Sequence, residues 1–186
     1  MSAATSALDN PYVLLAQMDS KCRTNAAGIP VDVDTREEWT GVEFALHGKE
    51  LLASMGEISE IVSIPPITRI PGVRPWVLGM ANMRGMLLPV IDMEKFLYGD
   101  DSITATGTNK RLLVIELGEV FVGLVIENVL GMRHFWVDEK EAELPASVDQ
   151  HIAPFIEYSY KRLGKNIPVF SMSRLVDSEA FMDVAV

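Results

Sequence analysis

The three histidines and the single cysteine are the side chains in this sequence with the widest catalytic and metal-binding use. His47, His134 and His151 stand far apart, and no two have the four-residue spacing at which a helix presents a pair of metal ligands. Cys22 has no histidine near it in the sequence, so an activated thiolate is not expected. We therefore expect no metal site and no nucleophilic catalysis.

Acidic pairs could act as acid and base, but here they lack the required context. Residues 37–38, 100–101 and 138–139 are adjacent carboxylates in polar, loop-like sequence, whereas a catalytic pair needs burial to separate the two pKa values. The sequence also has no phosphate-binding glycine loop and no Gly-x-Ser-x-Gly elbow. Catalytic residues can assemble from distant positions, so a small enzyme or ligand binder with a cleft near His134 or His151 remains an alternative.

Length and charge restrict the class of partner. A chain of 186 residues fits one domain with an extension and can bury a core without disulfides. Its net charge of −10 opposes binding to nucleic acid and to anionic lipid, while 48% hydrophobic residues require a core or a protein interface. Residues 1–10 lack a signal-peptide pattern, and the apolar run at 120–126 is too short to span a membrane. We expect a cytoplasmic protein with no direct membrane insertion.

Residues 1–38 are expected to form a helical extension followed by a linker. Asn10 suits the N-cap, Pro11 the first helical position, and Gly28 and Pro30 end the helix. One apolar stripe follows at three- and four-residue spacing, made by Leu14, Leu15, Met18 and Cys22. We favour packing of this stripe on the rest of the chain over docking of a partner, because such stripes are most often core.

Residues 39–186 have the pattern of a mainly-β domain. Short β-like runs separated by turn signals lie at residues 41–46, 50–54, 58–64, 86–91, 111–117, 120–126, 128–137, 155–163 and 167–170. Asp92 is expected to cap a short helix, and Ser171 or Ser173 another near the end of the chain. A polar loop at 99–109 divides the domain into halves. Many short strands and few long helices favour barrels or a sandwich.

The stretch from residue 79 to residue 85 is expected to form a tight, protein-docking loop. Gly79 and Gly85 bracket it, and Asn82 can hydrogen-bond the local backbone. Arg84 is then presented on a rigid turn, where its planar guanidinium can pair with a carboxylate of another protein.

The methionines around this turn admit two interpretations. Met80, Met83 and Met86 can supply adaptable apolar contact to a partner. Alternatively they belong to the core, while Arg84 pairs inside the molecule with Glu57 or Glu60.

The same segment resembles the signature of the CheW-like chemotaxis adaptor family. The matching positions are Glu57-Ile58, Ile61-Val62, Pro71-Gly72 and Val77-x-Gly79-x-x-Asn82-x-Arg84-Gly85-x-x-x-Pro89-Val90-Ile91-Asp92. Met83 and Met93 stand where the family usually has leucine, and Glu127 replaces an aspartate in a second-half motif. The resemblance covers about residues 39–176. The extension and residues 39–44 are similar to the family branch that serves type IV pilus twitching motility.

The resemblance implies a fold of two interlocked, small, five-stranded β-barrels with few short helices. It places the first barrel mainly at residues 39–98, the second mainly at 110–170, and a short C-terminal helix after them. It also implies no enzyme activity and no cofactor.

The implied function is that of a scaffold in two-component signal transduction. Its partners would be the regulatory domain of a CheA-like histidine kinase and the cytoplasmic tip of a methyl-accepting chemoreceptor, in receptor arrays at the membrane. Carried over by position, the partner-binding residues are Met55, Glu57, Ile58, Gly79, Asn82, Arg84 and Gly85. Alternatives are a flagellar-chemotaxis coupling protein and a kinase-independent structural protein of the pilus machinery.

Overall fold

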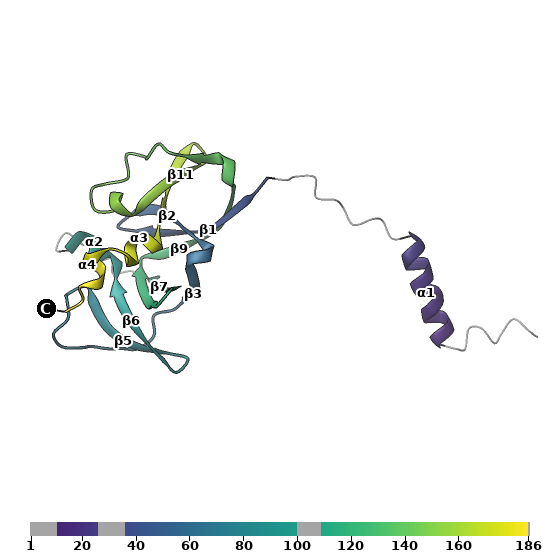
Figure 1. Cartoon of the computed structure of the whole chain (residues 1–186), viewed down its shortest axis with the longest axis horizontal. Coiled ribbons are helices and arrows are strands. Elements are labelled where there is room, and N and C mark those ends of the chain that lie inside the picture. Colours follow the sequence, from purple (N-terminus) through teal and green to yellow (C-terminus); the bar gives the residue numbers. More distant parts are fainter. Residues whose placement is uncertain (1–10, 26–35, 100–108, 186) are drawn as a thin grey trace, which may run out of the picture. The chain divides into compact units, whose positions relative to one another are not determined.

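The computed structural model describes residues 11–25, 36–99 and 109–185 (Figure 1). The chain divides into two units, residues 1–35 and residues 36–186, and each is described by itself. Within the described residues, no helix is both long and apolar enough to cross a membrane.

The first unit contains the helix α1 (Pro11–Asn25). Pro11 is its first residue, as expected, and an ion pair between Arg23 and Asp19 at 2.9 Å links neighbouring turns. The side chains of Leu14, Leu15 and Met18 are exposed on this unit. Packing of the stripe against the rest of the chain therefore stays a prediction. The expected N-cap Asn10 and the expected stop at 28–30 lie outside the described residues.

The first sheet of the second unit has the strand order β10-β11-β12-β2-β1-β9. Its strands are β1 (Glu38–Leu46), β2 (Lys49–Ser54), β9 (Asn128–Trp136), β10 (Lys140–Glu141), β11 (Ile156–Arg162) and β12 (Lys165–Phe170). All pairings are antiparallel except β12 with β2. Gly131 has a φ of 135° and lies opposite a register shift in β1, so the β9 strand is irregular at this glycine.

The second sheet has the order β3-β7-β8-β6-β5-β4. Its strands are β3 (Ile58–Val62), β4 (Ile67–Thr68), β5 (Val77–Met83), β6 (Met86–Asp92), β7 (Arg111–Leu117) and β8 (Val120–Ile126). Again one pairing is parallel, that of β6 with β8. Each sheet therefore has five longer strands and one two-residue strand at an edge.

Each sheet combines strands from both halves of the domain (Figure 1). The β1–β2 hairpin of the first half pairs with β9 and β12, while the β7–β8 hairpin of the second half pairs with β3 and β6. Four of the six strands of the second sheet lie within residues 39–98, and four of the six of the first sheet lie within 110–170, so the two exchanged hairpins are what departs from the division of the barrels mainly into these ranges. The physical reason is that each half contributes a hairpin to complete the sheet of the other, which is the interlocking itself.

Each sheet curls around a small apolar core of its own. Five strands of the first sheet contribute to one cluster: Trp39, Leu52, Phe135, Tyr158, Tyr160, Ile167 and Val169. All six strands of the second sheet contribute to another: Val62, Ile67, Leu78, Ala81, Met83, Leu88, Val90, Leu112, Val114, Phe121 and Val125. Strands at or next to opposite edges of a sheet can share one cluster only if the sheet is strongly curved.

A third and larger core lies between the two sheets. It includes Phe44 and Phe170 from the first sheet, Ile91 and Leu124 from the second, and Leu175 from a helix. Burial of this joint surface is the hydrophobic term that holds the two sheets together.

Short helices cover the joint core. They are α2 (Met93–Tyr98), α3 (Met172–Val176) and α4 (Glu179–Met182), with single 3₁₀ turns η1 (Met55–Glu57), η3 (Val137–Glu139) and η4 (Ala153–Phe155). The side chain of Asp92 accepts a hydrogen bond from Lys95 N, and that of Ser171 accepts one from Arg174 N, so both expected caps are confirmed. The mainly-β prediction with two sheets and few helices is confirmed as well.

Candidate functional site

The candidate docking residues lie at the turn between β5 and β6. Met83 pairs with Met86, and Arg84 and Gly85 form the two-residue turn between them. Their φ angles are 51° and 86°, the positive values that suit a tight hairpin to the twist of its strands. The expected loop over residues 79–85 is therefore wrong in extent, because the β5 ladder continues to Met83 and leaves only two residues to turn.

Asn82 stabilises this turn from the end of β5. Its Oδ1 accepts a hydrogen bond from Gly85 N at 2.9 Å, which confirms the local role expected for Asn82. The bond fixes the backbone on both sides of Arg84. As a result, the Arg84 side chain starts from a rigid position.

Arg84 combines the two roles considered in the sequence analysis, presentation to a partner and pairing with a carboxylate of its own chain. Its Nη1 lies 2.8 Å from Glu60 Oε1, yet the Arg84 side chain is 74% exposed. A guanidinium has five N–H donors, so this one ion pair leaves most of them facing solvent. The internal pair with Glu60 orients the side chain without burying it.

Apolar side chains surround Arg84 on the same hairpin. Met86 is exposed and Leu87 is 69% exposed, while Met80 and Met83 are half-buried. We define the hairpin tip as Asn82, Arg84, Gly85, Met86 and Leu87. The sequence analysis missed Leu87, because an apolar run at 86–91 was read as a buried strand. Strict alternation along β6 would have placed Leu87 and Leu88 on opposite faces.

Gly79 has a structural role away from the hairpin tip. It is buried, its φ is 137°, and a Cβ atom at this position would lie 2.1 Å from the carbonyl oxygen of Thr68. Only glycine permits β4 to approach β5 this closely. The prediction that Gly79 contacts a partner is therefore not supported by its position.

The three earlier candidates, Met55, Glu57 and Ile58, do not lie together on one surface. Ile58 is buried in the joint core, so it is not available for docking. The Glu57 carboxylate accepts hydrogen bonds from Ser173 N at 3.0 Å and Ser173 Oγ at 2.9 Å, and thereby caps the start of α3. Met55 is exposed. The Glu57 contacts are with a residue 116 positions away, which short-range patterns do not reveal. A docking role for Met55 and Glu57 stays a prediction.

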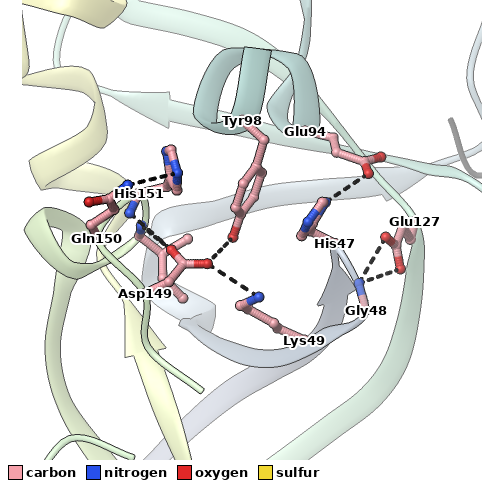
Figure 2. A network of polar contacts seen from close by, with 10 residues as sticks. His47, Gly48, Lys49, Glu94, Tyr98, Glu127, Asp149, Gln150 and His151 are labelled. Carbon is pink, nitrogen blue, oxygen red and sulfur yellow. Dashed lines mark hydrogen bonds and ion pairs between the residues drawn. The ribbon is translucent and has the colours of Figure 1, made fainter. Parts of the chain in front are cut away.

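A second polar cluster joins the β1–β2 turn to α2 (Figure 2). His47 Nδ1 lies 3.2 Å from Glu94 Oε1, and the imidazole stacks on the Tyr98 ring with centroids 3.9 Å apart. The Glu94 side chain is only 5% exposed. Gly48 N donates to Glu127 Oε1 at 3.1 Å.

The same cluster continues to Asp149 (Figure 2). Asp149 accepts hydrogen bonds from Tyr98 Oη at 3.3 Å and His151 N at 2.9 Å, and Lys49 Nζ lies 3.2 Å from it. Burial, followed by the nearby Asp149 charge, raises the pKa of the Tyr98 phenol. Although burial acts in the opposite direction, the backbone N–H groups of His151 and Ile152 and the Lys49 ammonium hold the pKa of Asp149 below its ordinary value.

This polar cluster has a structural role, because it connects the β1–β2 turn to α2 and to Asp149. Its carboxylates accept hydrogen bonds or ion pairs from the chain itself, as expected for buried polar groups that stabilise a fold. His134, the other histidine considered for a cleft, lies on β9 with its Nδ1 3.1 Å from Glu38 Oε1, and it is 57% exposed. Among the residues that the structure describes, no group of three or more histidine, cysteine, aspartate or glutamate residues is arranged to hold a metal ion.

Comparison with known proteins identifies relatives of the second unit and of the whole chain. Residues 40–180 match the family model described as CheW-like domain. Protein PilI of Pseudomonas aeruginosa is 38% identical over 179 residues, which cover 96% of this chain and 98% of PilI. The chemotaxis protein CheW of Bacillus subtilis is 27% identical over 140 residues, which cover 75% of this chain and 87% of that protein.

A solved structure has the same fold. The crystal structure of the scaffolding protein TtCheW from Thermoanaerobacter tengcongensis superposes with a TM-score of 0.66 at 22% sequence identity. The match covers 77% of this chain and 96% of TtCheW. At this identity the similarity establishes the fold alone.

Proposed function

Because this chain belongs to the family of CheW-like domain proteins, we propose that it is a non-enzymatic adaptor that couples methyl-accepting chemoreceptors to a CheA-like histidine kinase. In this role it works in the cytoplasm, where the tips of the receptors meet the kinase. An adaptor acts by contacting two partners at once. It therefore needs rigid surfaces with apolar contact and charge, and no activated nucleophile.

The observation that carries the proposal is the hairpin tip. Arg84 is fixed at its base by Asn82 and oriented by Glu60, yet its guanidinium remains mostly exposed beside Met86 and Leu87. Arginine with adjacent apolar side chains is a favourable composition for a binding hot spot. A turn held in one conformation also loses little entropy on binding.

We further propose that the signalling array controls type IV pilus twitching motility. Two facts support this assignment over flagellar chemotaxis. The alignment with PilI of Pseudomonas aeruginosa spans 96% of the chain, whereas that with CheW of Bacillus subtilis spans 75%. Residues 1–38 and 39–44 also carry the similarity to the pilus branch noted in the sequence.

The test is the charge reversal Arg84→Glu in the full chain. We expect binding to the kinase regulatory domain or to the receptor tip to weaken by more than about 2 kcal/mol, roughly thirtyfold. The free energy of unfolding should fall by no more than about 1 kcal/mol, because the Arg84 side chain is 74% exposed, although that of Glu60, at 27%, is partly buried. Calorimetric titration and urea denaturation measure the two quantities. Lys161→Glu, at an exposed cation on β11, is the control.

Two results would count against this role. If Arg84→Glu binds both partners as well as the unaltered chain does, the hairpin tip is not a docking surface. If the variant unfolds, Arg84 is structural. Co-purification from cells with mass spectrometry tests the wider proposal, since recovery of pilus motor proteins without receptor or kinase would favour a structural protein of the pilus.

A further inference from the structure

A basic cavity lies between the proline-containing connector that follows β4 and the start of α2. Its volume is about 290 Å³. Its walls are Arg69, Ile70, Val73, Arg74, Pro75, Val77, Leu78 and Lys95. We call this the connector pocket. It is separate from the hairpin tip, because none of its lining residues belongs to residues 82–87.

The connector pocket has the opposite charge to the protein as a whole. The chain has a net charge of −10, yet three of the eight lining residues are cationic and none is acidic. Within the described residues, the side chains of Arg69 and Lys95 form no ion pair. Local positive charge in an acidic protein attracts an acidic ligand, while the overall charge repels a polyanion such as nucleic acid.

The chain's own C-terminal segment shows what the rim of this pocket accepts. Arg74 forms an ion pair with the Asp183 carboxylate, and Arg74 N donates to the Val184 carbonyl oxygen at 3.0 Å. Val73 and Ala185 form an antiparallel bridge. A segment with one carboxylate is therefore held at the rim by main-chain and side-chain contacts together. Asp183 neutralises Arg74 and leaves Arg69 and Lys95 to bind further carboxylates.

The walls of the connector pocket are held in place before any ligand binds. Val77 N donates to the Arg74 carbonyl oxygen, and Asp92 N donates to that of Trp76, both at 2.9 Å. The Trp76 ring stacks on Phe181 and meets the edge of Phe96, which fastens the connector to α4 and α2. A pre-formed site loses less entropy on binding.

We propose that the connector pocket binds an extended acidic peptide segment of a partner protein. Carboxylates of that segment pair with Arg69 and Lys95, and its aliphatic groups contact Ile70 and Leu78. The site is a contact surface in addition to the hairpin tip, so it does not depend on the coupling role proposed above.

The test uses an end-blocked peptide that repeats the Asp-Val pair of residues 183–184, acetyl-Asp-Val-Asp-Val-Asp-amide. Titrated into the full ¹⁵N-labelled chain at low salt, it should shift the amide signals of Arg69, Ile70 and Lys95. Arg69→Glu and Lys95→Glu should each weaken binding at least about tenfold, as for loss of a charge-assisted hydrogen bond. Lys161→Glu changes the net charge equally at an exposed site outside the pocket and should preserve the affinity.

Three outcomes would overturn the proposal. Equal binding of the peptide with asparagine in place of aspartate would show that carboxylates are not recognised. An equal loss of affinity in Lys161→Glu would show a general charge effect. Equal shifts of the same amides by inorganic phosphate at the same concentration would show a simple anion site without peptide recognition.

Discussion

The β1–β2 turn and the β5–β6 turn use the same backbone geometry for opposite purposes. His47 and Arg84 each precede a glycine in a two-residue turn, and their φ angles are 50° and 51°. Non-glycine residues are uncommon at such angles, and asparagine, aspartate and histidine are several-fold enriched among those that occur there. At the first turn the side chain is stacked inside the molecule, whereas at the second it is mostly exposed. The arginine at position 84 is therefore explained by its side chain and not by the turn.

At the first turn, side-chain contacts compensate for an unfavourable backbone conformation. At the second turn, the same conformation presents a side chain to solvent. His47 offsets the local strain through its contacts with Tyr98 and Glu94. Arg84 has one ion pair, with the partly buried Glu60, and this pair offsets little because the guanidinium is mostly exposed. Strain without an internal compensation points to a role in binding.

The largest effect on the free energy of unfolding should come from His47→Ala, which removes the buried side chain of the two turns compared. Removal of the imidazole takes away the Tyr98 stacking partner and leaves the buried Glu94 carboxylate without its hydrogen bond. We expect a loss of about 2 kcal/mol in the free energy of unfolding, measured by urea denaturation. Partner binding per folded molecule should be unchanged.

His134→Ala is the matched control for this variant. His134 has a similar 3.1 Å contact with Glu38, but both side chains are more than half exposed. Its loss should change the free energy of unfolding by less than about 0.5 kcal/mol. Equal effects of the two substitutions would show that burial does not distinguish the sites.

A smaller effect is expected from Asp149→Asn, at the far end of the cluster that contains His47. The carboxylate of Asp149 has a pKa below its ordinary value. Its stabilising effect is therefore fully present above the unfolded pKa of about 4 and is lost as the pH falls through the lower folded value. We expect the variant to lose about 1 kcal/mol at neutral pH, discounted for partial exposure of the carboxylate.

The pH dependence is the decisive part of this experiment. Denaturation at neutral pH and below the folded pKa of Asp149 should give a difference between variant and unaltered chain that shrinks toward zero in acid. If the difference in the free energy of unfolding stays constant with pH, the asparagine side chain destabilises the fold through its shape and not through the loss of charge.

The smallest change, and one of opposite sign, is expected from Arg84→Asn. Asparagine tolerates a positive φ at the first position of a two-residue hairpin turn, so the free energy of unfolding should rise by about 0.5 kcal/mol. Binding to the kinase or receptor should weaken at the same time. A variant that loses both stability and binding would contradict the view that Arg84 is retained for binding.

Local signals in the sequence predicted the local parts of the structure. The β7–β8 hairpin, the caps Asp92 and Ser171, and the hydrogen bond of Asn82 to its own turn all depend on residues within a few positions. The parallel pairings of β12 with β2 and of β6 with β8 join distant segments. No short-range pattern encodes them, and so the residues alone did not predict which hairpins cross from one half to the sheet of the other.

In the candidate site too, the features that depend on neighbouring residues were predicted and those that depend on distant residues were not. The turn residues Asn82, Arg84 and Gly85 lie together because they are adjacent in the chain. Glu57 and Ile58 were placed on the docking surface by position in a motif, but α3 and the joint core, formed by distant residues, engage them instead. The basic connector pocket was not predicted, since Lys95 meets Arg69 and Arg74 only in the folded domain.

The exchange of hairpins between the halves also determines when this protein can fold as it leaves the ribosome. Within the first sheet, β1 and β2 are made before the other strands. Their sheet is complete only when synthesis has passed β12, which ends at Phe170. Contacts between such distant segments form slowly, because the long intervening loop must close first. The nascent chain therefore carries unpaired strand edges until β12 has been translated, and in this interval chaperones and premature self-association compete for it.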